Sequence, residues 1–278
     1  ISRYFTNTRG KALSTGWFGL STAEFLMPVT IIYALTIMDW RNIWIIISVA
    51  IILFLPLVSY FLVKEVKLSS REDDNEVIKQ NIKQWKRSEV IKDYRFIIIA
   101  LNMLAMPWIA TGIFVYQSFI LSAKNWGEYT IAQSFMVYSI ASVLTLFVAG
   151  YLIDKFTSRK LLIYMNIPFL ISLLILIYFQ SPVSSFFFLG LIGVSNGFAN
   201  VLGSSTWAEL YGVKFIGSIK ALTTALMVFS TAFGTAFFGL MIDFDFSIEQ
   251  ISMISGGYIL ISLILLFLIK NKLNPTIL

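Results

Sequence analysis

The stretch GYLIDKFTSRK, residues 150–160, places one aspartate and three basic residues between two long apolar runs. Residues 129–153, which lead into it, carry no charge, and residues 160–180 are uncharged after the first lysine. A helix needs about 20 apolar residues to cross the ~30 Å hydrocarbon core of a bilayer. Both runs meet this length, so the sequence predicts a charged turn between two membrane-spanning helices.

The same pattern extends along the whole chain, which is 58% hydrophobic and 13% charged with a mean hydropathy of +0.81. A soluble domain of 278 residues could not bury so much apolar surface. The runs are also far longer than the strands of a membrane barrel. We therefore predict an all-α, polytopic membrane protein with eight transmembrane helices, at residues 12–38, 42–63, 96–121, 129–153, 160–180, 184–208, 218–242 and 250–270.

Charge sets the direction of these helices. All of the 21 lysines and arginines except Arg41 and Lys124 fall on one side of the predicted membrane. Basic residues are retained on the cytoplasmic side, so we expect both ends of the chain and the polar loop 64–95 inside the cell. Within that loop, residues 76–91 have one apolar face and are expected to form a short amphipathic helix on the inner leaflet, with a flexible linker as the alternative.

Composition disfavours several classes of function. The chain has no cysteine and no histidine, so we expect no disulfide, no cofactor and no metal site. Its net charge of +6 is distributed between apolar runs, which indicates membrane topology and no nucleic-acid partner. The sequence also has no phosphate-binding loop and no nucleophile–base pair at a membrane surface, so we do not expect an enzyme.

An internal repeat gives the period of the fold. Residues 11–23, KALSTGWFGLSTA, and residues 220–232, KALTTALMVFSTA, are identical at seven of thirteen positions. The copies begin the first and the seventh predicted helix and enter the membrane from the same side, as parallel repeats do. Chance similarity between two apolar helices is the alternative. With six helices in each half, the copies are helices five and eleven of twelve, and four helices are expected before Ile1.

The turn at residues 150–160 resembles the signature loop of the major facilitator superfamily, which has a glycine, a leucine, an aspartate and several bases at fixed spacing. Thr157 stands where that loop usually has a second glycine, so we expect a less tight turn. The loop follows helices two and eight in the family, which agrees with the repeat. The matching residues are Gly150, Leu152, Asp154, Lys155 and Arg159.

Other segments also resemble bacterial members of this superfamily, most nearly branches distantly similar to the monocarboxylate and oxalate–formate carriers. These segments are RYFTNTRGKALS at residues 3–14, DWRNIW at 39–44, WKRSEVIKDYRF at 85–96 and GSIKAL at 217–222.

The resemblance implies a secondary transporter in a bacterial inner (plasma) membrane, of which this chain holds helices five to twelve. Residues 1–63 would end the N-terminal half, residues 64–95 would link the halves, and residues 96–278 would form the six-helix C-terminal half. Such a protein moves a small organic solute by alternating access. We expect it to be coupled to protons and to work as a monomer in the lipid bilayer.

The signature loop is expected to act as a cytoplasmic gate. Helix five begins beside it with a positive dipole end, and an aspartate placed there is stabilised by about 0.3–2 kcal/mol. Asp154 would thus latch the two halves together on the inside. The alternative is that Asp154 and its neighbouring bases only solvate a turn.

Glu24 is the acidic residue in the middle of the first predicted helix, about 18 Å from its start. Ionisable groups at this depth usually mark ion or substrate pathways. The equivalent residue of the second repeat is Phe233, so the fold does not require an acid there. We interpret Glu24 as the proton-coupling or substrate-binding acid, with a structural hydrogen bond as the alternative.

Further polar residues lie in helices that line the central cavity of this family. Helix seven is also expected to break at Pro107. Because no cation lies in the middle of a predicted helix, we expect these helices to form a cation-free cavity. A carrier of anionic carboxylates usually needs a cation there, so either the solute is not anionic or the cation lies in the helices expected before Ile1. Interhelical hydrogen bonding is the alternative role for these polar groups. The substrate-cavity candidates are Ser21, Asn102, Tyr116, Gln117, Gln133, Asn196, Asn200 and Ser204.

Two other functions stay open at this point. An aromatic-rich cavity with an intramembrane acid would suit a multidrug efflux antiporter that expels lipophilic cations. A membrane sensor or scaffold that keeps the fold without transporting is the second. The sequence does not separate these from a carrier of a small organic solute.

Overall fold

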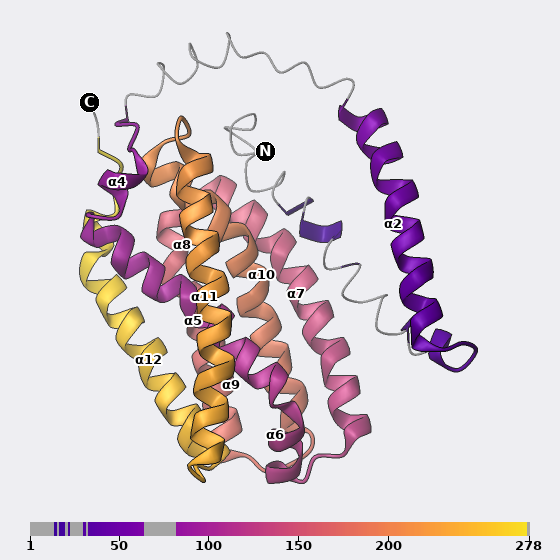
Figure 1. Cartoon of the computed structure of the whole chain (residues 1–278). Coiled ribbons are helices and arrows are strands. Elements are labelled where there is room, and N and C mark those ends of the chain that lie inside the picture. The colour runs from indigo at the N-terminus through magenta and orange to yellow at the C-terminus, as the bar shows by residue number, and fades with distance from the viewer. Residues whose placement is uncertain are drawn as a thin grey trace. The chain divides into compact units, whose positions relative to one another are not determined.

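The computed structural model describes residues 14, 15, 17–19, 22, 30, 31, 33–63 and 82–276. Every regular element within these residues is a helix (Figure 1). The chain divides into two compact units, one made of residues 22–81, which includes α2, and one made of the rest. The elements are α2 Trp40–Val63, α4 Arg87–Val90, α5 Tyr94–Val115, α6 Gln117–Lys124, α7 Glu128–Phe156, α8 Ser158–Met165, α9 Ile167–Tyr178, α10 Ser184–Tyr211, α11 Ile216–Asp243, α12 Ile248–Ile269 and η1 Lys270–Lys272.

Seven helical segments among the described residues are long and apolar enough to cross a membrane. They confirm seven of the eight predicted spans, and α8 and α9 together form one of them. The remaining prediction, at residues 12–38, lies mostly outside the described residues. The seven segments are Trp40–Val58, Tyr94–Val115, Gln133–Phe156, Ser158–Tyr178, Ser184–Tyr211, Ile216–Asp243 and Ile248–Lys272.

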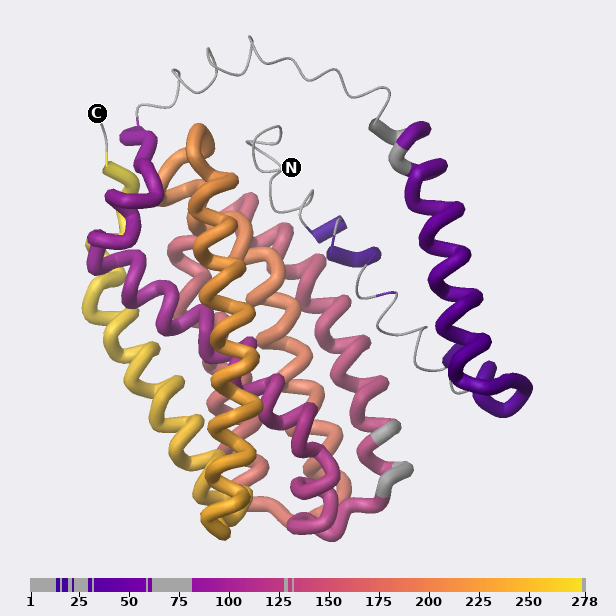
Figure 2. The backbone as a smooth tube through the Cα atoms, in the orientation of Figure 1, coloured from indigo at the N-terminus to yellow at the C-terminus, as the bar shows by residue number. Residues whose placement is uncertain are grey.

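Helices α7 and α10 pack against each other along much of their length, side by side in the backbone trace of Figure 2. A methyl group on Gly197 would lie 2.5 Å from the carbonyl oxygen of Ser142, so only glycine fits at this contact. Toward the start of both helices, the hydroxyls of Ser134 and Ser185 are hydrogen-bonded at 2.7 Å. Membrane helices associate through such small residues and polar contacts because lipid is as apolar as their side chains.

The helix predicted at residues 96–121 consists of two pieces. Helix α5 continues through Pro107, so the predicted break at that proline is wrong. Proline removes one backbone hydrogen bond, and membrane helices tolerate this loss where neighbouring helices hold them. The interruption instead falls at Tyr116, whose φ of −100° and ψ of 26° leave the helical range before α6 begins.

Large apolar side chains cover the outer surface of the unit that contains α5 to α12. Phe229 of α11 is 74% exposed, and Leu268 of α12 is 70% exposed. In water such exposure would be costly, whereas in a bilayer these side chains contact lipid tails. The exposed apolar surface therefore agrees with a membrane-embedded bundle.

Basic side chains gather at one end of this unit, which we name the basic end. It lies where α5, α8 and α11 begin and where α7, α10 and α12 end (Figure 1). Lys124, at the end of α6, lies at the opposite end. The basic end carries Arg95, Lys155, Arg159, Lys160, Lys214, Lys270 and Lys272.

The chain approaches the basic end through residues 82–86, which form no helix. The prediction of an amphipathic helix at residues 76–91 is therefore wrong for most of the described residues, 82–91, of which only α4 is helical. The backbone amide of Trp85 donates to the carbonyl of Tyr211 at 3.0 Å. In a helix this amide would donate to a carbonyl of its own segment, whereas here it donates to a carbonyl of α10.

Candidate functional site

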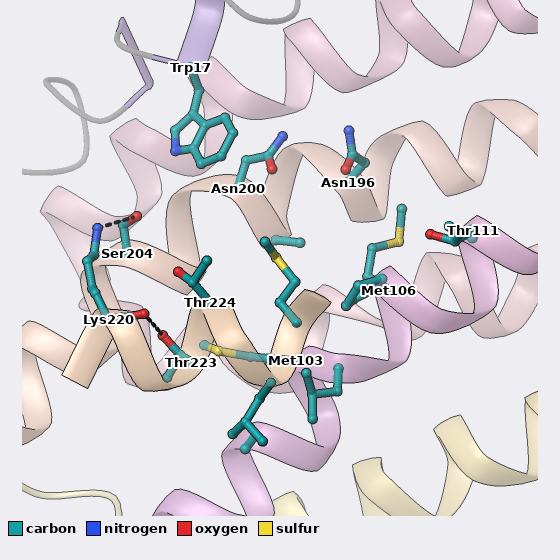
Figure 3. Close-up of a pocket in the computed structure, with 18 of the residues that line it drawn as sticks. Trp17, Met103, Met106, Thr111, Asn196, Asn200, Ser204, Lys220, Thr223 and Thr224 are labelled. Atoms are coloured by element: carbon teal, nitrogen blue, oxygen red, sulfur yellow. Dashed lines mark hydrogen bonds between the residues drawn. The ribbon is translucent and has the colours of Figure 1, made fainter. Parts of the chain in front are cut away.

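A cavity of about 410 Å³ lies among α5, α7, α10 and α11, and Trp17 also contributes to its wall (Figure 3). Ligand sites for small molecules are usually concave, largely apolar and supplied with a few convergent polar groups. This volume falls in the range of such sites, so the cavity is the candidate substrate site.

The polar part of the lining comes mainly from two helical stripes. On α10 the polar residues recur every four positions, which places them on one face of the helix. On α11 they occupy the second and third turns. The six residues are Asn196, Asn200 and Ser204 of α10, and Lys220, Thr223 and Thr224 of α11.

The apolar part of the lining is rich in methionine and aromatic side chains. Methionine is flexible and polarisable, so it adapts to ligands of different shape. Aromatic rings supply large contact areas with little loss of side-chain freedom. The residues concerned include Met103 and Met106 of α5, Met227 of α11, Trp17, Trp207 of α10 and Phe114 of α5.

Lys220 brings a cation into this lining. Its Nζ atom donates a hydrogen bond to the hydroxyl oxygen of Ser204 at 3.0 Å (Figure 3). The predicted cation-free cavity is therefore wrong. Lys220 lies near the start of α11 and therefore near the basic end, as its sequence position indicates. Its four-carbon side chain nevertheless extends to the cavity wall.

Asn196 and Asn200 differ in how their amides are used. The Asn196 amide donates to the hydroxyl of Ser142 on α7 at 3.1 Å, which helps to fix its orientation. The side-chain amide of Asn200 has no hydrogen-bond partner among the described residues. Its donor and acceptor are thus available to a solute in the cavity.

Three of the predicted cavity residues, Asn196, Asn200 and Ser204, thus line one cavity. The other described candidates lie elsewhere. Asn102 is fully buried and donates to Ser262 of α12 at 3.3 Å, so it joins two helices. Tyr116 occupies the interruption between α5 and α6, and Gln117 borders a second, much smaller apolar pocket. Gln133 is half-buried on α7 and is not part of the cavity wall.

Ser21 and Glu24 lie outside the described residues. Their repeat equivalents, Ser230 and Phe233, are in α11. The hydroxyl of Ser230 donates to the carbonyl of Leu104 at 3.2 Å, and the ring of Phe233 contacts Trp108 with centroids 5.6 Å apart. Both equivalent positions therefore face α5.

The signature-loop residues surround the turn from α7 to α8. Thr157, which separates these helices, has a φ of 74° and a ψ of 146°. Backbone of this kind suits glycine and strains a residue with a β-carbon. The less tight turn expected from the missing glycine is therefore wrong, because the chain adopts a glycine-like conformation with threonine.

Two signature residues lie in α7 just before this turn. Gly150 is buried, and Leu152 packs with the residues between α7 and α10. Lys155 is exposed, with its ammonium 5.3 Å from the ring centre of Phe156. Asp154 is half-buried near the end of α7. The start of helix five, to which the sequence assigns the latch contact of Asp154, is outside the described residues.

Arg159 and Glu209 hold the same turn in place. The Glu209 carboxylate accepts a hydrogen bond from the backbone amide of Ser158 at 3.0 Å, and Arg159 lies 3.6 Å from the same carboxylate. Arg159 also donates to the carbonyl of Leu273 at 2.8 Å and to the side chain of Asn274 at 3.0 Å. The turn is thereby tied to α10 and to the segment after α12.

Within the part of the chain that the structure describes, no three acidic side chains gather closely enough to hold a metal ion. The chain also has no histidine or cysteine.

Membrane-length helices around a cavity with polar and apolar walls agree with a polytopic membrane protein of the transporter class. The sequence profile of the Major Facilitator Superfamily matches residues 1–235 and, in a second alignment, residues 97–277. The chain therefore belongs to the Major Facilitator Superfamily, whose members are membrane transporters and not typically enzymes. Among curated proteins, no significant match to the chain was found.

Proposed function

We propose that the protein is a secondary active transporter that moves a small organic solute by alternating access. The observation that carries this proposal is the cavity, in which the polar stripe of α10 meets the first turns of α11. The unpartnered amide of Asn200 gives the cavity a hydrogen-bonding group that a bound solute can use. Methionine and aromatic side chains complete a wall suited to an apolar body.

The same proposal includes the arrangement in the membrane. Residues 96–278 form the second six-helix half, residues 64–95 link the halves, residues 1–63 end the first half, and the transporter works as a monomer. The two alignments of the profile, residues 1–235 and 97–277, together extend over the residues that this arrangement assigns to both halves. We place the basic end in the cytoplasm, because short membrane loops retain lysine and arginine on that side.

The signature loop would serve as the cytoplasmic gate. Arg159 and Glu209 fix the turn on the side of α10. Asp154, at the end of α7, is the residue that we propose meets helix five. A negative charge at the positive end of that helix would favour the closed inner side by about 0.3–2 kcal/mol. The contact would open when the cavity faces the cytoplasm.

The cavity assignment is tested by filling the cavity. Asn200→Trp puts an indole into the space that the solute would occupy, whereas Phe187→Trp puts the same indole at an exposed position of the same helix. Saturable uptake by the full-length protein in proteoliposomes should fall at least about ten-fold in Asn200→Trp and stay near wild type in Phe187→Trp. Equal uptake by both variants would place the substrate site elsewhere.

Proton coupling is the second part of the proposal, and Glu24 is the residue proposed to carry it. Glu24→Gln should abolish uptake driven by a pH jump while solute exchange without a gradient continues. Asp39→Asn, at the start of the second predicted helix, removes a carboxylate near a membrane surface and serves as the control. Full pH-driven uptake in Glu24→Gln would refute the coupling role.

A multidrug exporter is the second candidate, because a methionine-rich wall suits lipophilic compounds of varied shape. Extrusion of lipophilic dyes by the full-length protein, measured beside uptake of small polar solutes, separates the two candidates. Absence of any solute movement would instead favour a sensor or scaffold.

A further inference from the structure

Lys220 differs from three other buried or half-buried cations of this unit in the kind of partner that it has. Arg95 lies 2.8 Å from Asp93, Arg159 lies 3.6 Å from Glu209, and Lys124 lies 2.7 Å from Glu249. Each of these three cations faces a carboxylate. The described partner of Lys220 is a neutral hydroxyl, that of Ser204 at 3.0 Å.

Among the described residues that line the cavity, no acidic side chain is present to neutralise Lys220. Among the described residues that line it, the polar groups are amides, hydroxyls and this one ammonium. An ammonium taken partly out of water is stabilised strongly by an opposite charge and only weakly by a hydroxyl. A solute with an anionic group supplies that missing charge when it enters the cavity.

The positions of the polar groups also define the shape of such a solute. Ser204, Asn200 and Asn196 follow one another along α10 at steps of four residues, or about 6 Å per step. Figure 3 shows Lys220 beside Ser204 at one end of this row and Asn196 at the other. A solute with its anion at Lys220 would bring a hydrogen-bonding group about 6 Å away to Asn200.

The body of the solute would then lie against apolar side chains. Met103 and Met106 of α5 and Met227 of α11 line the cavity beside the polar row. Their flexible thioethers fit flat or branched apolar groups equally well. The wall thus accommodates an amphipathic molecule with one charged end.

We propose that the transported solute is an organic anion with an apolar body, and that Lys220 binds its anionic group and selects for it. This inference rests on the proposed function, since it takes the cavity to be the substrate site. It assigns the end of the cavity near Lys220 and Ser204 to the anion and the Asn200 region to a second polar group of the solute.

Three molecules of nearly equal shape and different charge test the proposal: 4-hydroxyphenylacetate, 4-hydroxyphenylacetamide and tyramine. Binding to the purified full-length protein is followed as the shift of its unfolding temperature with ligand concentration. The wild type should bind the carboxylate about ten-fold more tightly than the amide, and the amine least. Phenylacetate, which lacks the second polar group, should bind more weakly than 4-hydroxyphenylacetate.

Variants identify the cation responsible. Lys220→Met should remove the preference for the carboxylate, and Lys220→Arg should keep most of it. Lys214→Met removes a cation from the same end of the bundle, where Lys214 is exposed and absent from the cavity wall, and should bind like wild type. Equal binding of the carboxylate and the amide by the wild type, or an unchanged preference in Lys220→Met, would overturn the proposal.

Transport measurements distinguish failure of the anion proposal from failure of the proposed transport function. If Asn200→Trp blocks uptake of a neutral or cationic solute while Lys220→Met leaves it intact, the transporter assignment stands and the anion assignment is wrong. If the full-length protein moves no solute at all, the proposed function itself fails.

Discussion

Arg159 and Lys220 are both half-buried cations in the half of the bundle near the basic end, yet they have different surroundings. Arg159 faces the Glu209 carboxylate and donates to Leu273 and Asn274. Lys220 contacts the hydroxyl of Ser204 and borders a cavity of about 410 Å³. One cation is enclosed by protein acceptors, and the other faces space that a solute can enter.

The comparison separates a cation that stabilises the bundle from one that is available for binding. A group whose partners are all protein atoms contributes mainly to stability, since removing it leaves those partners unsatisfied. Removing a group that borders open space costs the ligand-free protein little stability. A substitution at Arg159 should therefore change mainly the stability of the protein, whereas a substitution at Lys220 should change mainly the binding of a ligand.

The largest expected effect on stability belongs to Arg159. Arg159→Met removes the cation that lies 3.6 Å from the Glu209 carboxylate and leaves the carbonyl of Leu273 without this donor, so the free energy of unfolding should fall by about 2–3 kcal/mol. Lys220→Met should change it by less than about 1 kcal/mol. Unfolding of the two variants in the same detergent gives the comparison. Equal losses would show that Lys220 is also a structural cation.

A smaller effect, of opposite sign, is expected at Thr157. Its φ of 74° and ψ of 146° cost a non-glycine residue roughly 1–3 kcal/mol, part of which glycine loses again through its freedom in the unfolded chain. Thr157→Gly should therefore stabilise the basic end by about 1 kcal/mol. Thr157→Ala keeps the β-carbon and should bring no gain. A loss of stability in Thr157→Gly would mean that the turn is not strained.

Much of the fold could be predicted from the sequence because lipid imposes a simple rule on helix length. Seven of the eight predicted spans are found at nearly the predicted positions, and the charged turn at residues 150–160 separates two of them. The exact interruption of a helix was harder to predict. Pro107 is tolerated within α5, whereas the break at Tyr116 has no proline to announce it.

The site was predicted only in part, for reasons of side-chain reach and interhelical contact. The spacing of Asn196, Asn200 and Ser204 predicts one polar face, and these residues do line one cavity. Asn102 looks similar in the sequence but is directed to Ser262, which helical periodicity alone cannot reveal. The sequence predicts that Lys220 lies at the membrane surface, because hydropathy locates its α-carbon and not its ammonium.

One signal in the sequence could have revealed Lys220. It begins the repeat at residues 220–232, and the aligned residue of the first copy is also a lysine, Lys11. The repeat pairs Trp17 with Leu226 in the same way, and both of these residues line the cavity. The repeat thus indicates that Lys220 serves the cavity and not only the membrane topology.

The most direct test of the account is to invert the charge at position 220. Competition for solute uptake is measured in proteoliposomes for the wild type and for Lys220→Glu, with carboxylate, amide and amine competitors of the same shape. We predict that the wild type prefers the carboxylate and that Lys220→Glu prefers the amine. The same order of preference in both proteins would contradict the assignment of Lys220 to the bound solute.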